Sequence, residues 1–220
     1  MARVYDIVSR LENANQKPEI KIDEEHIYKV NNSKAVALRI MALSEDKETK
    51  ETEILDKIVT LALGKEACDY INSLDLSLSA HNTIINAIMA AIGDVEIEDI
   101  EEQAKKKKSL ENKWYDIFED FDLIEASFAM QYNIRLRSET EMTWSEFSTL
   151  LKGIMPETPL GQIVSIRSEE DKEILKHFTK EQHRIRNEWR NRHNSFETMS
   201  EEEKEEEMKK VQEIFAKAFG

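Results

Sequence analysis

The most strongly apolar helical pattern in the first half of the chain is SAHNTIINAIMAAIG, residues 79–93. Its apolar residues recur at intervals of three and four, which is the spacing of one helix face. They are Ile84, Ile85, Ile88, Met89, Ala91 and Ile92. Ser79 is expected to cap the start of this helix, and Gly93 is expected to end it. A face this apolar predicts a buried helix at the centre of a helical module.

The sequence before this stretch predicts more helices and one small hairpin. Helical spacing indicates helices at residues 3–13, 34–43, 48–63 and 65–74, with Gly64 as a stop. Between the first two, apolar and polar residues alternate around residues 20–30, which is typical of a β-hairpin. A hairpin this small must pack on helices to be stable.

The composition supports the same fold class for the whole chain. Of the 220 residues, 40% are apolar and 35% are charged, and only five are glycine and three proline. Such a chain suits helices joined by short polar turns and offers little material for a sandwich or barrel. We therefore predict a mainly α protein of two helical modules, the first with a small N-terminal β-hairpin.

The joint between the modules is predicted at the lysine run Lys105, Lys106, Lys107 and Lys108. Residues 1–104 contain 11 Lys and Arg against 21 Asp and Glu, whereas all three tryptophans and all eight phenylalanines follow the run. A change in aromatic content at a charge run indicates separate modules. The predicted division is residues 1–104, a junction at 105–112, and residues 113–220.

The second module begins with the strongly patterned stretch 114–128, which predicts a helix from Trp114. Glu119, Asp120 and Asp122 are interpreted as the water-exposed face of that helix. Thr143 and Glu146 have the spacing of a capping box at the start of a helix that ends at Gly153.

Three further helices are predicted after Gly153. Thr158 and Pro159 are expected to start a short one. A long one spans residues 168–192, and an acidic, then amphipathic one spans residues 200–219. The long helix is rich in Lys and Arg between Lys172 and Arg192, which leaves three interpretations open. These charges pair with acids at 197–207 or remain solvated, they form a partner-docking face that includes Arg184, or they bind RNA.

The motifs of common enzymes are missing. The sequence has no zinc-ligand spacing, no glycine-rich phosphate loop and no nucleophile elbow. We therefore predict no enzymatic activity, no cofactor and no metal. The net charge of −14 argues against nucleic acid as the main ligand. No apolar run is long enough for a membrane helix, so a soluble, cytoplasmic protein is expected. Cys68 is interpreted as a small buried residue.

A second pattern carries a resemblance to a known family. It consists of Phe128-Ala129-Met130-Gln131-Tyr132-Asn133-Ile134, Met142-Thr143-Trp144-Ser145-Glu146-Phe147, Leu150-Leu151, Gly153, Thr158 and Ile166-Arg167. It resembles the bacteriophage tail-assembly family of Gram-positive phages and prophages over residues 110–193. Asn133 replaces the usual glycine of the turn, and Asn also tolerates the left-handed conformation. The first module is similar to the short tail assembly chaperones encoded before the tape measure protein.

The resemblance implies a non-enzymatic chaperone of tail assembly, in a phage or in a phage-tail-like particle. The first module would coat the tape measure protein, and the second would recruit tail tube subunits. The chain itself, or a shorter form of it, is a further expected partner. The expected location is the cytoplasm of the bacterial host, and the chaperone is expected to be absent from the mature particle. The alternative is a connector or baseplate subunit that stays in the particle.

Candidate partner-binding residues follow from this hypothesis. They are Ile84, Ile88 and Met89 in the first module, with core packing as the alternative, and Trp144, Phe147 and Arg184 in the second. Such phages often make a short chaperone and, by ribosomal frameshifting, a longer fused form. Lys105 to Lys108 are therefore the proposed frameshift junction, because consecutive AAA codons are slippery, with a plain linker as the alternative.

Overall fold

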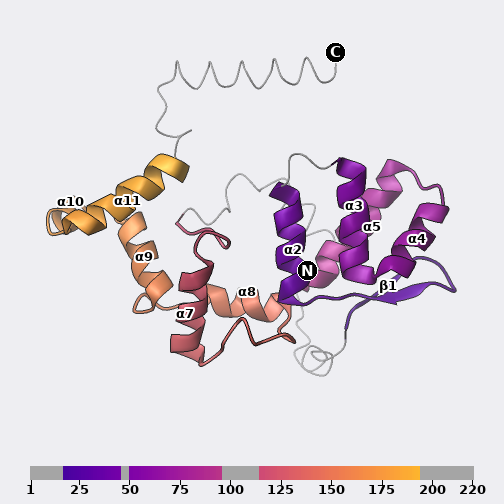
Figure 1. Cartoon of the computed structure of the whole chain (residues 1–220), viewed down its shortest axis with the longest axis horizontal. Helices are drawn as coiled ribbons and strands as arrows, with labels where there is room; N and C mark the ends of the chain where they lie inside the picture. Colours follow the sequence, from indigo (N-terminus) through magenta and orange to yellow (C-terminus); the bar gives the residue numbers. More distant parts are fainter. Residues whose placement is uncertain (1–16, 46–49, 96–113, 194–220) are drawn as a thin grey trace, which may run out of the picture. The chain divides into compact units, whose positions relative to one another are not determined.

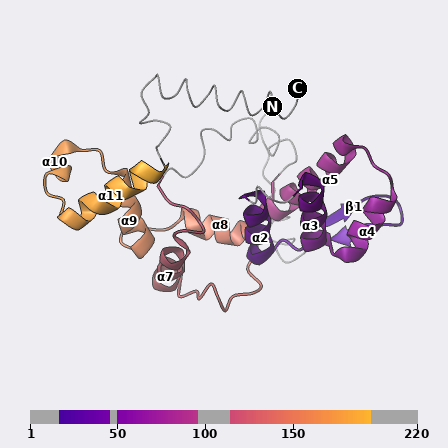
Figure 2. The same ribbon diagram turned by 45° about the horizontal axis from the view of Figure 1, so that its top comes forward.

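The computed structural model describes residues 17–45, 50–95 and 114–193. The chain divides into two compact units, whose helices and strands are drawn in Figures 1 and 2. The first unit contains the described residues up to 95 together with Arg135–Gly153. The second contains residues 114–134 and 154–193. The compact units therefore differ from the predicted modules in one respect, because residues 135–153 belong to the first unit.

The first unit begins with the predicted hairpin. Strands β1 (Glu19–Lys21) and β2 (Ile27–Lys29) pair antiparallel, with Ile20 opposite Tyr28. The connection closes with a hydrogen bond of 2.9 Å from the Ile22 amide to the His26 carbonyl. Ile20 and Ile22 pack on the helical core, which gives the small sheet the support it needs.

Four helices follow, α2 (Lys34–Glu45), α3 (Glu51–Leu63), α4 (Lys65–Ser73) and α5 (Leu78–Gly93). Gly64 separates α3 from α4 at φ 95°, a conformation that residues with a Cβ rarely adopt. Ile40, Ile71 and Ile88 are the most deeply buried isoleucines of the core, and Cys68 is buried beside them, as predicted. The residues 79–93 that predicted a central helix therefore contribute to this core.

A further helix of this unit is α8 (Trp144–Lys152), which comes from the later part of the chain. It packs against α2 and α5. Thr143 and Glu146 form the predicted capping box, and Gly153 is the C-cap.

Among the described residues, the second unit contains α7 (Phe121–Tyr132), α9 (Pro159–Ser168), α10 (Lys172–Leu175) and α11 (Lys180–His193). Helix α9 packs against both α7 and α11. Thr158 caps α9 and Pro159 is its first residue, as predicted. Asn133 ends α7 at φ 56°, which is the left-handed conformation expected for the residue that replaces glycine.

Two predicted helix starts were wrong. Ser77, not Ser79, caps α5, whereas the helix ends at Gly93 as predicted, with the left-handed Asp94 as its C-cap. The helix predicted from Trp114 begins at Phe121, because the Asp116 carboxylate accepts hydrogen bonds from the Phe118 and Glu119 amides and forms a turn.

The long helix predicted at 168–192 is interrupted between α10 and α11. Thr179 and Gln182 form a reciprocal pair, in which the Gln182 amide donates to Thr179 Oγ1 at 3.2 Å and the Thr179 amide donates to Gln182 Oε1 at 2.8 Å. This is the capping-box geometry, and it starts a new helix. The predictions at residues 3–13, 105–112 and 200–219 lie outside the described residues.

Candidate partner-binding site

Helix α8 is attached to the first unit through a short backbone bridge. Ser33 and Thr143 face each other in an isolated antiparallel pair. The Lys34 amide donates to the Met142 carbonyl at 2.9 Å, and the Trp144 amide donates to the Asn32 carbonyl at 2.9 Å. These backbone hydrogen bonds therefore tie the start of α8 to the start of α2.

A buried lysine strengthens this attachment. Lys34 is 6% exposed, and its Nζ donates a hydrogen bond to the Glu139 carbonyl. Burial lowers the pKa of Lys34, although the nearby Glu139 acts in the opposite direction. A buried ammonium group needs hydrogen-bond partners, so the path of residues 139–142 is tied to the start of α2.

The apolar side of α8 completes the interior of the first unit. Trp144 packs on the core cluster that includes Ile88, and its ring centroid lies 5.4 Å from that of Phe147. Phe147 and Ile88 are fully buried, while Ile84 and Met89 are partly buried against the same core. The structure therefore brings five of the six candidate partner-binding residues into one unit, where they form or line its core.

The sixth candidate, Arg184, lies on the surface of α11. It forms ion pairs with Glu181 at 2.5 Å and with Glu188 at 3.0 Å, both on the same helix. These hydrogen bonds and charges raise the pKa of Arg184 above its ordinary value. Acidic residues close in the sequence thus neutralise part of the charge of the basic stretch. The acidic residues at 197–207, which were predicted to pair with it, lie outside the described residues.

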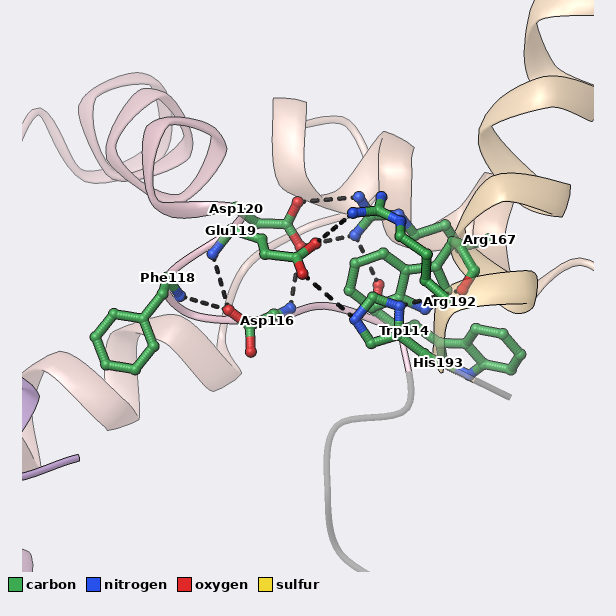
Figure 3. A network of polar contacts seen from close by, with 9 residues as sticks. Trp114, Asp116, Phe118, Glu119, Asp120, Arg167, Arg192 and His193 are labelled. Carbon is green, nitrogen blue, oxygen red and sulfur yellow. Dashed lines mark hydrogen bonds and ion pairs between the residues drawn. The ribbon is translucent and has the colours of Figure 1, made fainter. Parts of the chain in front are cut away.

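The second unit contains a buried ion pair that the sequence analysis missed (Figure 3). Arg167 Nη1 donates to Asp120 Oδ2 at 2.7 Å, and Nη2 donates to Asp120 Oδ1 at 2.9 Å. Asp120 is 4% exposed and Arg167 is 8% exposed. The interpretation of Asp120 as a water-exposed residue was therefore wrong, whereas Glu119 and Asp122 are exposed.

One aromatic ring covers this ion pair. The Arg167 guanidinium lies 3.6 Å from the centroid of the buried Trp189 ring, which in turn stacks on His193 at 3.7 Å. Arg167 Nη1 also donates to the Trp114 carbonyl at 3.1 Å, and Arg190 lies 4.8 Å from the Trp114 ring centroid. The planar guanidinium of arginine can stack flat on an aromatic ring and form a bidentate pair with a carboxylate, whereas the ammonium group of lysine cannot.

We call Trp114, Asp120, Arg167 and Trp189 the Arg167 cluster. It joins the turn before α7, helix α9 and helix α11. Arg167 was part of the resemblance motif, so the motif was the one sequence signal of its importance. Nothing in helical spacing indicates that Asp120 is its partner, because 47 residues separate them.

The second unit also exposes large apolar side chains. Met130 on α7 is 64% exposed and Met155 is 57% exposed. The Met155 amide donates to Gln131 Oε1 at 2.9 Å, which holds Met155 beside the end of α7 that carries Met130. We call these two residues the methionine pair. Methionine side chains adapt their shape readily and are common at surfaces that bind other proteins.

No group of His, Cys, Asp or Glu side chains in the described residues is arranged to hold a metal ion. In the same segments, no helix combines the length and apolarity that crossing a membrane requires. The proposed frameshift junction at Lys105 to Lys108 lies outside these residues.

The family model described as bacteriophage Gp15 protein matches residues 16–191. The chain belongs to the bacteriophage Gp15 family. It is therefore a phage protein, and the family suggests a structural or assembly-related role. The match spans both compact units, including α8 and the Arg167 cluster. No curated protein and no solved structure matches the chain.

Proposed function

We propose that this Gp15-family protein is a non-enzymatic chaperone of phage tail assembly, which binds the tape measure protein and recruits tail tube subunits. The observation that carries the proposal is the family match over residues 16–191, which makes the chain a phage protein. The resemblance of residues 110–193 to the tail-assembly family supplies the finer assignment. A phage-tail-like particle would use the same activity.

The surface of the second unit supports a binding role. The methionine pair offers two exposed, adaptable apolar side chains on a helical scaffold. The chain as a whole has a net charge of −14, which keeps a protein soluble while part of its surface remains apolar. A chaperone that holds aggregation-prone helices needs both properties.

The proposed division of labour follows the sequence modules. Residues 1–104 would hold the tape measure protein, and residues 113–220 would recruit the tail tube protein. The methionine pair lies in the second module and is the proposed contact for tail tube subunits. The protein would act in the host cytoplasm and leave before the particle is complete.

Co-expression of the tagged full chain with the tape measure and tail tube proteins tests this proposal. We expect the chain to retain both partners in a pull-down. The double variant Met130→Asp, Met155→Asp should keep the tape measure protein and lose the tail tube protein. Ile174→Asp is the matched control, because Ile174 is also exposed in the second unit but lies on α10. If the unaltered chain retains neither partner, the chaperone proposal fails.

The alternative function is a connector or baseplate subunit. Such a subunit would stay in the finished particle, whereas a chaperone would not. Mass spectrometry of purified particles therefore separates the two functions. Stoichiometric amounts of this chain in mature particles would favour the structural subunit.

We also propose that Lys105 to Lys108 mark a frameshift junction, so that the chain is the long form of two products. The gene sequence tests this directly. Slippery AAA codons and a shorter product that ends near the run are expected. An uninterrupted frame with mixed AAG codons and no shorter product would remove this part of the proposal.

A further inference from the structure

Helix α8 is part of the first unit, but in the sequence it lies between two pieces of the second. The chain leaves the second unit at residues 134–135 and returns to it at residues 153–154. Asn133, in the left-handed conformation, and Gly153 stand at these crossings. The few residues at such a crossing can act as a hinge, because they absorb a change in backbone direction between two compact units.

The contacts that hold α8 in place do not depend on these connections. The face of α2 and α5 recognises the segment through the bridge between Ser33 and Thr143 and through the hydrogen bond from Lys34 to the Glu139 carbonyl. Met142, Phe147 and Leu151 then supply buried apolar side chains. An identical segment from another molecule would make every one of these contacts.

An empty acceptor face would be costly for the protein. Removal of α8 would expose Phe147, which is fully buried, together with the core that Trp144 covers. Exchange of α8 between molecules avoids this cost, because each face stays filled. The balance between the two arrangements is then set by the concentration of copies and by the connecting segments.

We propose that the face of α2 and α5 is an interface between copies of this chain, in which the α8 segment of one copy (residues 135–153) occupies the face of another. Each copy carries one face and one α8 segment, so exchange between two copies, or around a closed ring of copies, leaves every face filled. The proposal does not depend on the chaperone function. It does assign a surface to the self-association expected for the chain.

Disulfide trapping in the full chain tests the exchange. The backbone hydrogen bonds from Lys34 and Trp144 flank Ser33 and Thr143, which makes these two a non-hydrogen-bonded antiparallel pair. The Cα atoms of such pairs are about 4.5 Å apart. This separation falls in the range that a disulfide bridges. One chain carries Ser33→Cys, a second carries Thr143→Cys, and both carry Cys68→Ala to remove the free thiol.

After mixing at high concentration and oxidation, we expect a covalent species that contains one chain of each kind, several-fold above the control. In the control mixture, Asn191→Cys on α11 replaces Thr143→Cys. This mixture measures the yield of disulfides that form by chance collision. A covalent yield equal to the control would overturn the proposal. A chain with both Ser33→Cys and Thr143→Cys checks the geometry at low protein concentration. It should close an internal disulfide, and failure to do so would remove the bridge on which the proposal rests.

Discussion

Arg167 and Asp120 form a bidentate ion pair in the interior of the second unit, although 47 residues separate them in the sequence. The pair connects α9 to the turn before α7, and Trp189 of α11 covers the guanidinium. The three segments of this unit are thus held by one polar cluster as well as by apolar packing.

Loss of Arg167 should destabilise the protein strongly. Arg167→Ala leaves Asp120 buried without its charge partner, and breaking such a pair costs about 3–5 kcal/mol. Arg184→Ala is the matched control, because the ion pairs of Arg184 are exposed to solvent, and we expect a much smaller change in stability. Urea unfolding monitored by tryptophan fluorescence measures both. Equal losses for the two variants would contradict the assigned role of Arg167.

The hydrogen bond between Tyr70 and Asp23 should make stability depend on pH. This bond, together with that from His26, holds the pKa of Asp23 well below its usual range, and the bond to Asp23 raises the pKa of Tyr70 to about 12. A lowered carboxyl pKa stabilises the folded state above the unfolded value of about 3.9, and the effect is lost as the pH falls further. A raised tyrosine pKa stabilises below about 10 and is lost as the pH rises through the folded value.

We therefore expect Tyr70→Phe to weaken the loss of stability below about pH 4 that the unaltered chain shows. Tyr28→Phe is the control on the neighbouring strand, because burial is the main cause of the raised pKa of Tyr28. Thermal unfolding across a pH series compares the two. If both variants follow the pH profile of the unaltered chain, the bond between Tyr70 and Asp23 contributes nothing measurable.

The capping box of α8 should contribute measurably to stability. Thr143 Oγ1 accepts from the Glu146 amide at 3.1 Å, and the Thr143 amide donates to Glu146 Oε2 at 2.9 Å. Thr143→Ala should cost about 1 kcal/mol. Glu146→Gln should cost less, because glutamine can still accept the reciprocal hydrogen bond. Thr140→Ala, at an exposed position nearby, should stay within about 0.5 kcal/mol in the same denaturant titration.

Two glycine substitutions should destabilise for different reasons. A Cβ at Gly161 would lie 2.1 Å from the Met155 carbonyl oxygen, so the backbone would have to move, at about 1–3 kcal/mol. A Cβ at Gly64 meets no atom within 4 Å, but its φ of 95° is strained for alanine, at about 1–3 kcal/mol. Chemical denaturation gives both values. Asparagine tolerates positive φ better than alanine does, so Gly64→Asn should recover part of the loss while Gly161→Asn should not.

Several local features were predictable because they depend on neighbours in the sequence. The Gly64 stop, the capping box at Thr143 and the start of α9 at Thr158 were all predicted and are confirmed. The break between α10 and α11 was equally local, since Thr179 and Gln182 carry a capping signature. The amphipathic pattern of residues 168–192 continues across this break, so it predicts one long helix instead of two.

The site could be predicted only in part. Helical spacing identified Ile88 and Phe147 as apolar, but both an interior and a binding surface use such residues. Both side chains are completely buried in the first unit, and their role in partner binding stays a prediction. Asp120 could not be recognised, because a lone acid in an acidic stretch has the same pattern whether it faces water or a buried arginine.

By itself, the sequence determined the helical class, the hairpin, most helix ends and the phage-like motif, because these depend on spacing and on contacts within a few residues. Only the tertiary structure decided that residues 135–153 belong with the first unit and that Asp120 pairs with Arg167. Both depend on contacts between segments far apart in the chain. Periodicity states which face of a helix is apolar, but it does not state which distant segment will cover that face.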